Sequence, residues 1–223
     1  KTVMTTEPKF IPKEAVEIEI SDGVKVSVRM IDCVGFMVDG AVGHMENDAE
    51  RMVKTPWFGH EIPFTQAAEI GTRKVIHDHS TIGLVITTDG SFSEIGRESY
   101  RQAEERTVVE LQKIGKPYIV LLNTIRPYSA DTKELAEQLS AQYGVSVLPI
   151  NCEQLKKEDV DRIMQKILDE FPVSELQFGI PKWTELLPKE HPVKQGMIQN
   201  AKEMLGRFIK MKDLKNAKKQ LFA

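Results

Sequence analysis

The sequence has few cysteines, no long apolar run and no excess of basic residues. Cys33 and Cys152 are its only cysteines, and one pair without CxxC spacing gives neither a disulfide framework nor a zinc motif. The longest apolar runs, such as 82–86 and 117–122, are far shorter than the roughly 18 residues that a membrane-spanning helix needs. With 30 Lys and Arg against 33 Asp and Glu, the net charge of -3 excludes a generally basic nucleic-acid binder. We therefore expect a protein of the reducing cytoplasm that binds no nucleic acid.

The composition is enough for one folded domain, or for one domain plus an appendage. A hydrophobic fraction of 41% in 223 residues is too high for a disordered chain. Between Lys202 and Ala223 there are seven basic and two acidic residues, and the 23 basic and 31 acidic residues before Lys202 give that part a net charge of -8. The charge is therefore uneven, with the basic excess at residues 202–223.

Two segments near the N-terminus alternate apolar and polar residues. Residues 15–20 and 24–31 have the period of two that is typical of β-strands. Asp22 and Gly23 between them can adopt the positive φ angles of a tight turn, so a β-hairpin is predicted. Residues 36–64 have no sustained period and contain several glycines and prolines. We expect a long loop without regular structure, a feature that is usually functional.

Helical and strand-like patterns alternate over the middle of the chain. Helices are predicted over 65–79, 97–114, 131–143 and 157–170, and apolar strands over 81–88, 117–123 and 145–150. Strands that alternate with helices of this length pair in parallel, with helices on both faces of the sheet. The sequence therefore predicts an α/β fold with three layers, in which only the N-terminal hairpin is antiparallel.

The pattern changes near Phe171. A boundary there divides the chain into a domain of residues 1–171 and a mainly helical region of residues 172–223. A strand is expected over 173–178, followed by one helix over 195–221 with an apolar stripe along one face. That stripe needs a cover, which is either the chain's own domain or a following domain or another subunit.

Asp32 and Gly35 form an Asp-x-x-Gly motif at the end of a hydrophobic strand. In P-loop nucleotide hydrolases such an aspartate holds Mg²⁺, and the glycine N–H contacts the terminal phosphate. Thr5 and Thr6 lie one strand upstream, where a threonine hydroxyl can bind Mg²⁺ and its carbonyl can orient the attacking water. The simpler interpretation is an aspartate that stabilises a loop and two threonines in a coil. The hairpin and the long loop around the motif favour the nucleotide site.

A base-reading element is expected after the predicted strand 117–123. Guanine-binding proteins carry Asn-Lys-x-Asp there, and the aspartate accepts hydrogen bonds from the guanine N–H groups. This chain has Asn123 but Thr124 in place of lysine and Arg126 in place of aspartate. A guanidinium has no acceptor, so guanine selectivity should be lost and adenine is favoured. Phe36 also replaces the glutamine that orients water in many GTPases.

The chain also resembles a known family, the stage IV sporulation protein A family of endospore-forming bacteria. The likeness runs from Lys1 to about Pro181 and is carried by residues 4–10, 32–35, 55–57, 67–76, 85–90, 103–106 and 115–117. The resemblance implies a P-loop NTPase fold of the translation-factor GTPase type. It further implies an ATPase that binds ATP with Mg²⁺, hydrolyses it and polymerises into the basement layer of the spore coat.

The resemblance also implies site residues, partners and a location. Thr5 and Thr6 match the family's sensor threonines and Asp32 its Mg²⁺-binding aspartate, with Gly35 as the phosphate contact and Asn123 and Arg126 on the base side. The implied partners are further copies of the protein and other spore coat morphogenetic proteins. A small amphipathic anchor peptide would attach the polymer to the outer forespore membrane, in the mother-cell cytoplasm.

One departure from the family bears on activity. The family's phosphate-binding loop and the strand before it lie upstream of Lys1, so we expect a fragment that does not hydrolyse ATP alone. Two rival hypotheses stay open. One is an NTPase-like assembly module without turnover, whose contact surfaces are Trp57, Phe58 and the basic stripe from Lys202. The other is an ordinary GTPase, which Arg126 argues against.

Overall fold

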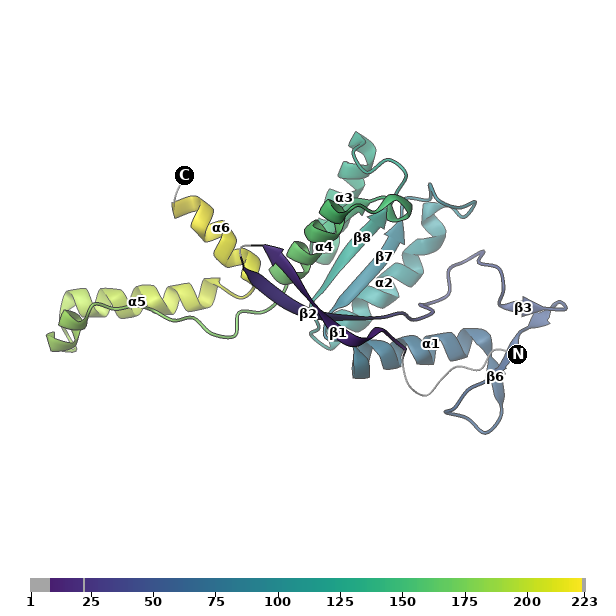
Figure 1. Cartoon of the computed structure of the whole chain (residues 1–223), viewed down its shortest axis with the longest axis horizontal. Coiled ribbons are helices and arrows are strands. Elements are labelled where there is room, and N and C mark those ends of the chain that lie inside the picture. Colours follow the sequence, from purple (N-terminus) through teal and green to yellow (C-terminus); the bar gives the residue numbers. More distant parts are fainter. Residues whose placement is uncertain (1–8, 22, 222–223) are drawn as a thin grey trace. The chain divides into compact units, whose positions relative to one another are not determined.

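The computed structural model describes residues 9–21 and 23–221. Figure 1 traces the order of its helices and strands along the chain. The chain divides into two compact units, Lys1–Ile167 and Leu168–Ala223. No helix in the described ranges is long and apolar enough to cross a bilayer.

A three-stranded parallel sheet is the centre of the first unit. Strands β7 (Gly83–Thr88), β8 (Tyr118–Asn123) and β9 (Val147–Ile150) pair in that order. Val85 lies opposite Val120, which in turn lies opposite Val147. The predicted parallel pairing of these three strands is confirmed.

Alternate residues of β8 point to opposite faces of the sheet, as the strand period requires. On one face, Val120 and Leu122 pack with residues of α2 (Arg97–Lys113) and α3 (Ala130–Tyr143). On the other face, Ile119 and Leu121 pack with Ile163 of α4 (Lys157–Asp169). Because helices cover both faces of β8, its run is apolar throughout.

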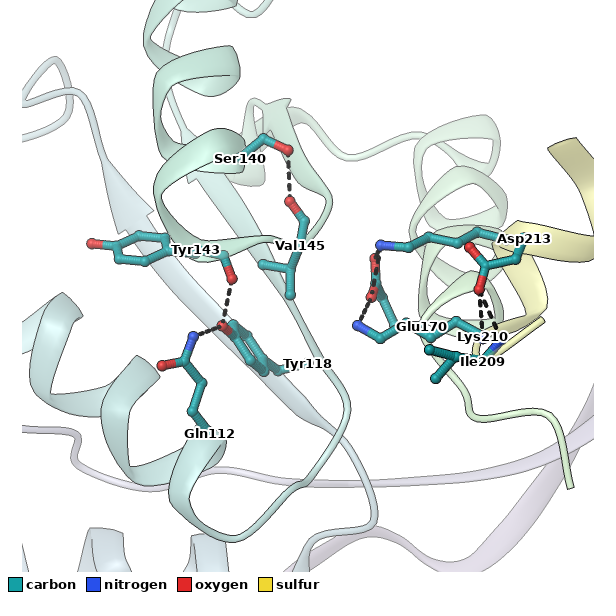
Figure 2. A network of polar contacts seen from close by, with 10 residues as sticks. Gln112, Tyr118, Ser140, Tyr143, Val145, Glu170, Ile209, Lys210 and Asp213 are labelled. Atoms are coloured by element: carbon teal, nitrogen blue, oxygen red, sulfur yellow. Dashed lines mark hydrogen bonds and ion pairs between the residues drawn. The ribbon is translucent and has the colours of Figure 1, made fainter. Parts of the chain in front are cut away.

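Hydrogen bonds reinforce the α2–α3 side of this sheet. Figure 2 shows the Tyr118 hydroxyl donating to the carbonyl of Tyr143 at 3.2 Å while it accepts from Gln112 at 3.0 Å. The Ser140 hydroxyl donates to the carbonyl of Val145 at 2.7 Å, just past the end of α3. Gly144 between them has a φ of +67°, a conformation that favours glycine at a helix end.

The β7 side of the sheet is less covered. Leu84 and Ile86 lie opposite Ile119 and Leu121 and so share the α4 face. They are 42% and 61% exposed, whereas Ile119 and Leu121 are buried. In the described ranges, β8 is the only strand that pairs with β7. The outer edge of β7 therefore has no strand partner in the described ranges, and Leu84 and Ile86 present apolar side chains to solvent.

The predicted N-terminal hairpin is confirmed. Strand β1 (Phe10–Ser21) pairs in antiparallel fashion with β2 (Val24–Ile31). These two strands form a sheet of their own, separate from the parallel sheet. The turn between them contains Gly23 with a φ of +79°.

The expectation of an unstructured loop over residues 36–64 was wrong, and so was the expectation of a single antiparallel pair. Strands β3 (Met45–Glu46) and β4 (Ala49–Glu50) pair around a turn in which Asn47 and Asp48 have positive φ angles. Strands β5 (Met52–Lys54) and β6 (Glu61–Pro63) form a second pair. Strands of two or three residues are too short to give a detectable period.

The predicted helix over 65–79 is present in two parts. Helix α1 (Phe64–Lys74) continues into a π-helical turn, η1 (Val75–His79). Ala67 packs with Val53 and Ile62 of the β5–β6 pair in a small cluster of its own. At the far end, the Lys116 ammonium donates to the carbonyls of Ile76 and His77 at 2.5 and 2.8 Å.

The second unit departs from prediction in two places. Residues 173–178 form no strand; the only pairing there is a bridge between Pro172 and Lys210. The helix predicted over 195–221 is divided into α5 (Pro192–Arg207) and α6 (Met211–Leu221), and a short 3₁₀ helix, η3 (Lys182–Leu186), precedes them.

Hydrogen bonds to other groups explain the break between α5 and α6. The backbone N–H groups of Ile209 and Lys210 donate to the Asp213 carboxylate at 3.1 and 2.8 Å, as Figure 2 shows. The Met211 N–H donates to the carbonyl of Phe171 at 3.0 Å, and the Ile209 carbonyl accepts from Val173 at 2.9 Å. These bonds satisfy backbone groups that a continuous helix would pair internally.

Candidate functional site

The candidate site lies in the loops that follow the carboxyl ends of the parallel strands, where open α/β sheets bind ligands. Asp89 directly follows β7, Asn123 ends β8, and Asn151 directly follows β9. The Asp89 N–H donates to the Asn123 carbonyl at 3.4 Å, and the Thr124 N–H to the Ile150 carbonyl at 2.9 Å. Backbone hydrogen bonds thus connect the ends of neighbouring strands.

Asp89 fastens the loop after β7 to the loop after β8. One carboxylate oxygen accepts from the Thr124 hydroxyl at 2.6 Å, and the other accepts from the Ser91 N–H at 3.0 Å. The Ser91 hydroxyl in turn accepts from the Ile125 N–H at 3.1 Å. Burial raises the pKa of Asp89, but the hydrogen bonds from Ser91 and Thr124 together lower it by more than burial raises it. The pKa of Asp89 therefore lies below its ordinary value. The ionised Asp89 carboxylate is therefore the form that connects the loop after β7 to the loop after β8.

The predicted base-side residues Asn123 and Arg126 both belong to this edge. The Asn123 side-chain oxygen accepts from the Cys152 N–H at 2.9 Å and so positions the loop after β9. Arg126 donates its backbone N–H to the Thr124 hydroxyl at 3.1 Å. Its guanidinium is exposed and pairs with no other residue in the described ranges. The arrangement leaves Arg126 available to a ligand at the loop surface.

Beneath this edge lies a buried ion pair that the sequence analysis missed. Arg97 donates to both carboxylate oxygens of Glu104, at 2.6 and 2.9 Å, and to the Thr87 hydroxyl at 2.9 Å. The Tyr143 hydroxyl donates to Glu104 at 2.5 Å. The Glu104 side chain is only 2% exposed. The seven-residue spacing of Arg97 and Glu104, two helical turns, was the available signal.

The Asp32–Gly35 turn follows the separate hairpin. Asp32 is exposed, and its carboxylate forms no hydrogen bond or ion pair with another described residue. Gly35 has a φ of +83°, a backbone conformation that favours glycine. Crowding is not the reason for glycine here, because an added Cβ would meet no atom within 4 Å. Burial is the main cause that raises the pKa of the adjacent Cys33 thiol. The turn thus presents an unpaired carboxylate and a glycine backbone.

The structure brings together only part of the predicted site. Asn123 and Arg126 share the carboxyl edge of the parallel sheet, whereas Asp32 and Gly35 follow a strand of the other sheet. Thr5 and Thr6 lie outside the described residues.

Trp57, which the sequence analysis named as a contact residue, and His77 both have local contacts. The Lys74 ammonium lies 5.7 Å from the centre of the Trp57 ring, which places Trp57 beside α1. His77 Nε2 lies 3.5 Å from a carboxylate oxygen of Glu110 at the surface between η1 and α2. Over the described ranges, no group of three His, Cys, Asp or Glu side chains is arranged to hold a metal ion.

Fold and site together define a mixed α/β protein with polar loops at the carboxyl edge of a parallel sheet. Residues 1–172 match the family model described as stage IV sporulation protein A, ATPase domain, and residues 173–223 match the model of its middle domain. The chain belongs to the stage IV sporulation protein A family. No solved structure gives a significant match.

Curated relatives support this assignment. The chain is 45% identical to stage IV sporulation protein A of Bacillus anthracis, 46% to that of Clostridioides difficile strain 630 and 43% to that of Bacillus subtilis strain 168. Each alignment covers 214 residues, which are 96% of this chain and 44% of the relative. The chain therefore spans less than half the length of these relatives. The names support a role in sporulation and an ATPase activity within the family.

Proposed function

We propose that this chain forms the magnesium-binding and base-binding parts of an ATP-hydrolysing site in a P-loop NTPase of the translation-factor GTPase type. The observation that carries the proposal is the turn after β2, where an unpaired Asp32 carboxylate precedes Gly35 with its positive φ. This turn lies within the residues that match an ATPase-domain model.

Asp32 suits Mg²⁺ because the ion commonly takes one or two protein carboxylates and completes its shell with phosphate oxygens and water. A single exposed carboxylate is therefore a sufficient protein ligand, with the Thr6 hydroxyl as a second. Bound Mg²⁺ neutralises charge on the phosphates during phosphoryl transfer. The Gly35 N–H contacts the terminal phosphate, and Thr5 and Thr6 set the position of the attacking water.

Arg126 favours adenine over guanine on the base side. At this position a guanine-binding protein offers a carboxylate to the N–H groups of the base, whereas a guanidinium offers only donors. Adenine presents a ring-nitrogen acceptor at the corresponding edge. The Thr124 hydroxyl accepts from the Arg126 N–H and so keeps the backbone at Arg126 in place.

The uncovered side of β7 supports a larger sheet in the complete protein. Exposed Leu84 and Ile86 and the unpaired edge of β7 are suited to a further strand and helix. A strand there would lead into the phosphate-binding loop and bring the β2 turn and the β8 loop to one nucleotide. This chain alone is then expected not to hydrolyse ATP.

The proposed assembly follows from the sporulation family. The complete protein would polymerise in the mother-cell cytoplasm into the basement layer of the spore coat. Other spore coat morphogenetic proteins would join it, and a small amphipathic anchor peptide would attach it to the outer forespore membrane. An assembly module without turnover is the alternative, and the exposed Ile198, Met204 and Leu205 of α5 favour a contact surface in the second unit.

Nucleotide binding by the complete protein tests the proposal. When ATP and GTP compete, we expect the protein to prefer ATP and to bind it only in the presence of Mg²⁺. Asp32→Ala should weaken Mg²⁺–ATP binding at least tenfold, because it removes the carboxylate ligand. Asp39→Ala, which removes another exposed carboxylate from the same loop, is the matched control and should bind normally. Preference for GTP, or equal binding by Asp32→Ala and the wild type, would contradict the proposal.

A further inference from the structure

Phe36 is an anchor for the segment that follows the Asp32–Gly35 turn. It is 6% exposed and is the only buried residue within 32–41, a range that the structure describes completely. Val34, within the turn, is by contrast 53% exposed. Where many GTPases carry a water-orienting glutamine, this chain therefore has a side chain that points into the protein.

Arg106 of α2 holds this anchor. Its guanidinium carbon lies 4.6 Å from the centre of the Phe36 ring, within the range of a cation–π contact. The same guanidinium forms an ion pair with Glu69 of α1, at 2.7 Å. Arg106 thus contacts the residue after the phosphate-sensing glycine and helix α1 simultaneously.

The three parts that meet at Arg106 each have apolar support. Helix α2 is fixed to the parallel sheet by Val108 and Leu111, which are 1% and 2% exposed. Helix α1 packs instead through Ala67 on the β5–β6 pair, in a different cluster. The turn itself has Phe36. Helix α1 meets the α2 cluster at its far end, where Ile76 of the continuous turn η1 packs with Val108 and Leu111. The contacts of Arg106 with Phe36 and Glu69 attach the turn to both helices beside Gly35.

We propose that Arg106 is a positioning residue that holds the Gly35 N–H in place for the terminal phosphate. The inference rests on the proposed ATPase function and adds a residue to it. An arginine suits this task because its flat face stacks on the ring while its N–H edge remains free for the Glu69 carboxylate. Lysine, with a single ammonium, does not present a face and an edge at once.

Steady-state ATP hydrolysis by the complete protein tests the assignment. We expect Arg106→Gln and Phe36→Leu each to lower kcat about tenfold while KM for ATP stays within about twofold, because misplacement of the turn affects the reaction more than binding. The double variant should be no slower than the single variants, because both substitutions remove the same contact between Arg106 and Phe36. Arg101→Gln is the matched control: Arg101 is on the same helix in an exposed pair with Glu98, and kcat should not change.

A charge exchange separates the ring contact from the ion pair. Glu69→Arg combined with Arg106→Glu restores the ion pair but moves the guanidinium from α2 to α1. We expect the exchanged protein to melt like the wild type and to keep the low kcat. Recovery of kcat in the exchanged protein, or a normal kcat in Arg106→Gln, would overturn the role of Arg106 but not the proposed ATPase function. Absence of hydrolysis by the wild type would overturn the proposed function and this inference together.

Discussion

At position 124 the chain has a short buried hydroxyl where guanine-binding proteins have a lysine. Thr124 is fully buried and bonds to Asp89, so the substitution is part of a network rather than a simple loss. Asn123 and Arg126 were found in the sequence because a strand end followed by a known motif marks them. Asp89 was missed because its partner is 35 residues away, and no local pattern reports such a pair.

The buried pair of Arg97 and Glu104 gives a test at the scale of single residues. Glu104→Gln removes a carboxylate and leaves a guanidinium that is only 15% exposed without its counter-ion. Loss of one partner of a buried pair costs about 3 kcal/mol, so we expect that decrease in the free energy of unfolding. Chemical denaturation measures it. Glu98→Gln, in an exposed pair on the same helix, should unfold like the wild type, and equal stability of both variants would refute the assignment.

Among the structural elements, those with four or more residues and a clear period were predictable. The hairpin, the parallel strands and helices α1 to α4 follow from patterns that one segment carries by itself. The short strands β3 to β6 carry too few residues to show a period. The break between α5 and α6 depends on bonds from Phe171, Val173 and Asp213, which no helical pattern contains. Tertiary hydrogen bonds therefore determine where α5 ends and α6 begins.

Glu170 gives a pH test at the scale of the element α6. Its side chain is fully buried and accepts from Lys210 at 2.7 Å and Lys212 at 3.0 Å; Lys215 pairs similarly with Asp169. Burial raises the pKa of Glu170, but the bonds from the two lysines lower it by more than burial raises it. The pKa of Glu170 therefore lies below its ordinary value of 4.5. A lowered folded-state pKa means that the stabilisation is complete above pH 4.5 and is lost as the pH falls through the folded-state pKa.

We therefore expect the amide signals of α6 to show loss of protection below pH 4.5 in hydrogen exchange corrected for intrinsic rates. Glu170→Gln should lower the protection of α6 at neutral pH and make it nearly independent of pH. Glu203→Gln, at an exposed position of α5, should keep the wild-type pH profile. A wild-type profile in Glu170→Gln would show that this carboxylate does not hold α6.

On the scale of the whole molecule, the proposed site is divided. The base-side loops belong to the parallel sheet, and the Asp32–Gly35 turn belongs to the hairpin. Sequence motifs marked the residues of both parts but not how the two parts lie, because a motif identifies a residue and not its distance from another sheet. Because the chain spans 44% of the length of these relatives, we propose that the complete protein assembles the site.

The most direct measurement of that claim is phosphate release from ATP with Mg²⁺ by the complete protein and by its Thr5→Ala, Thr6→Ala double variant, with ATP binding measured in parallel. We expect the complete protein to hydrolyse ATP and the variant, at ATP concentrations that saturate it, to release phosphate at least tenfold more slowly, because the threonines act on the transition state. Equal hydrolysis by both proteins, or no hydrolysis by the complete protein, would contradict the proposed site.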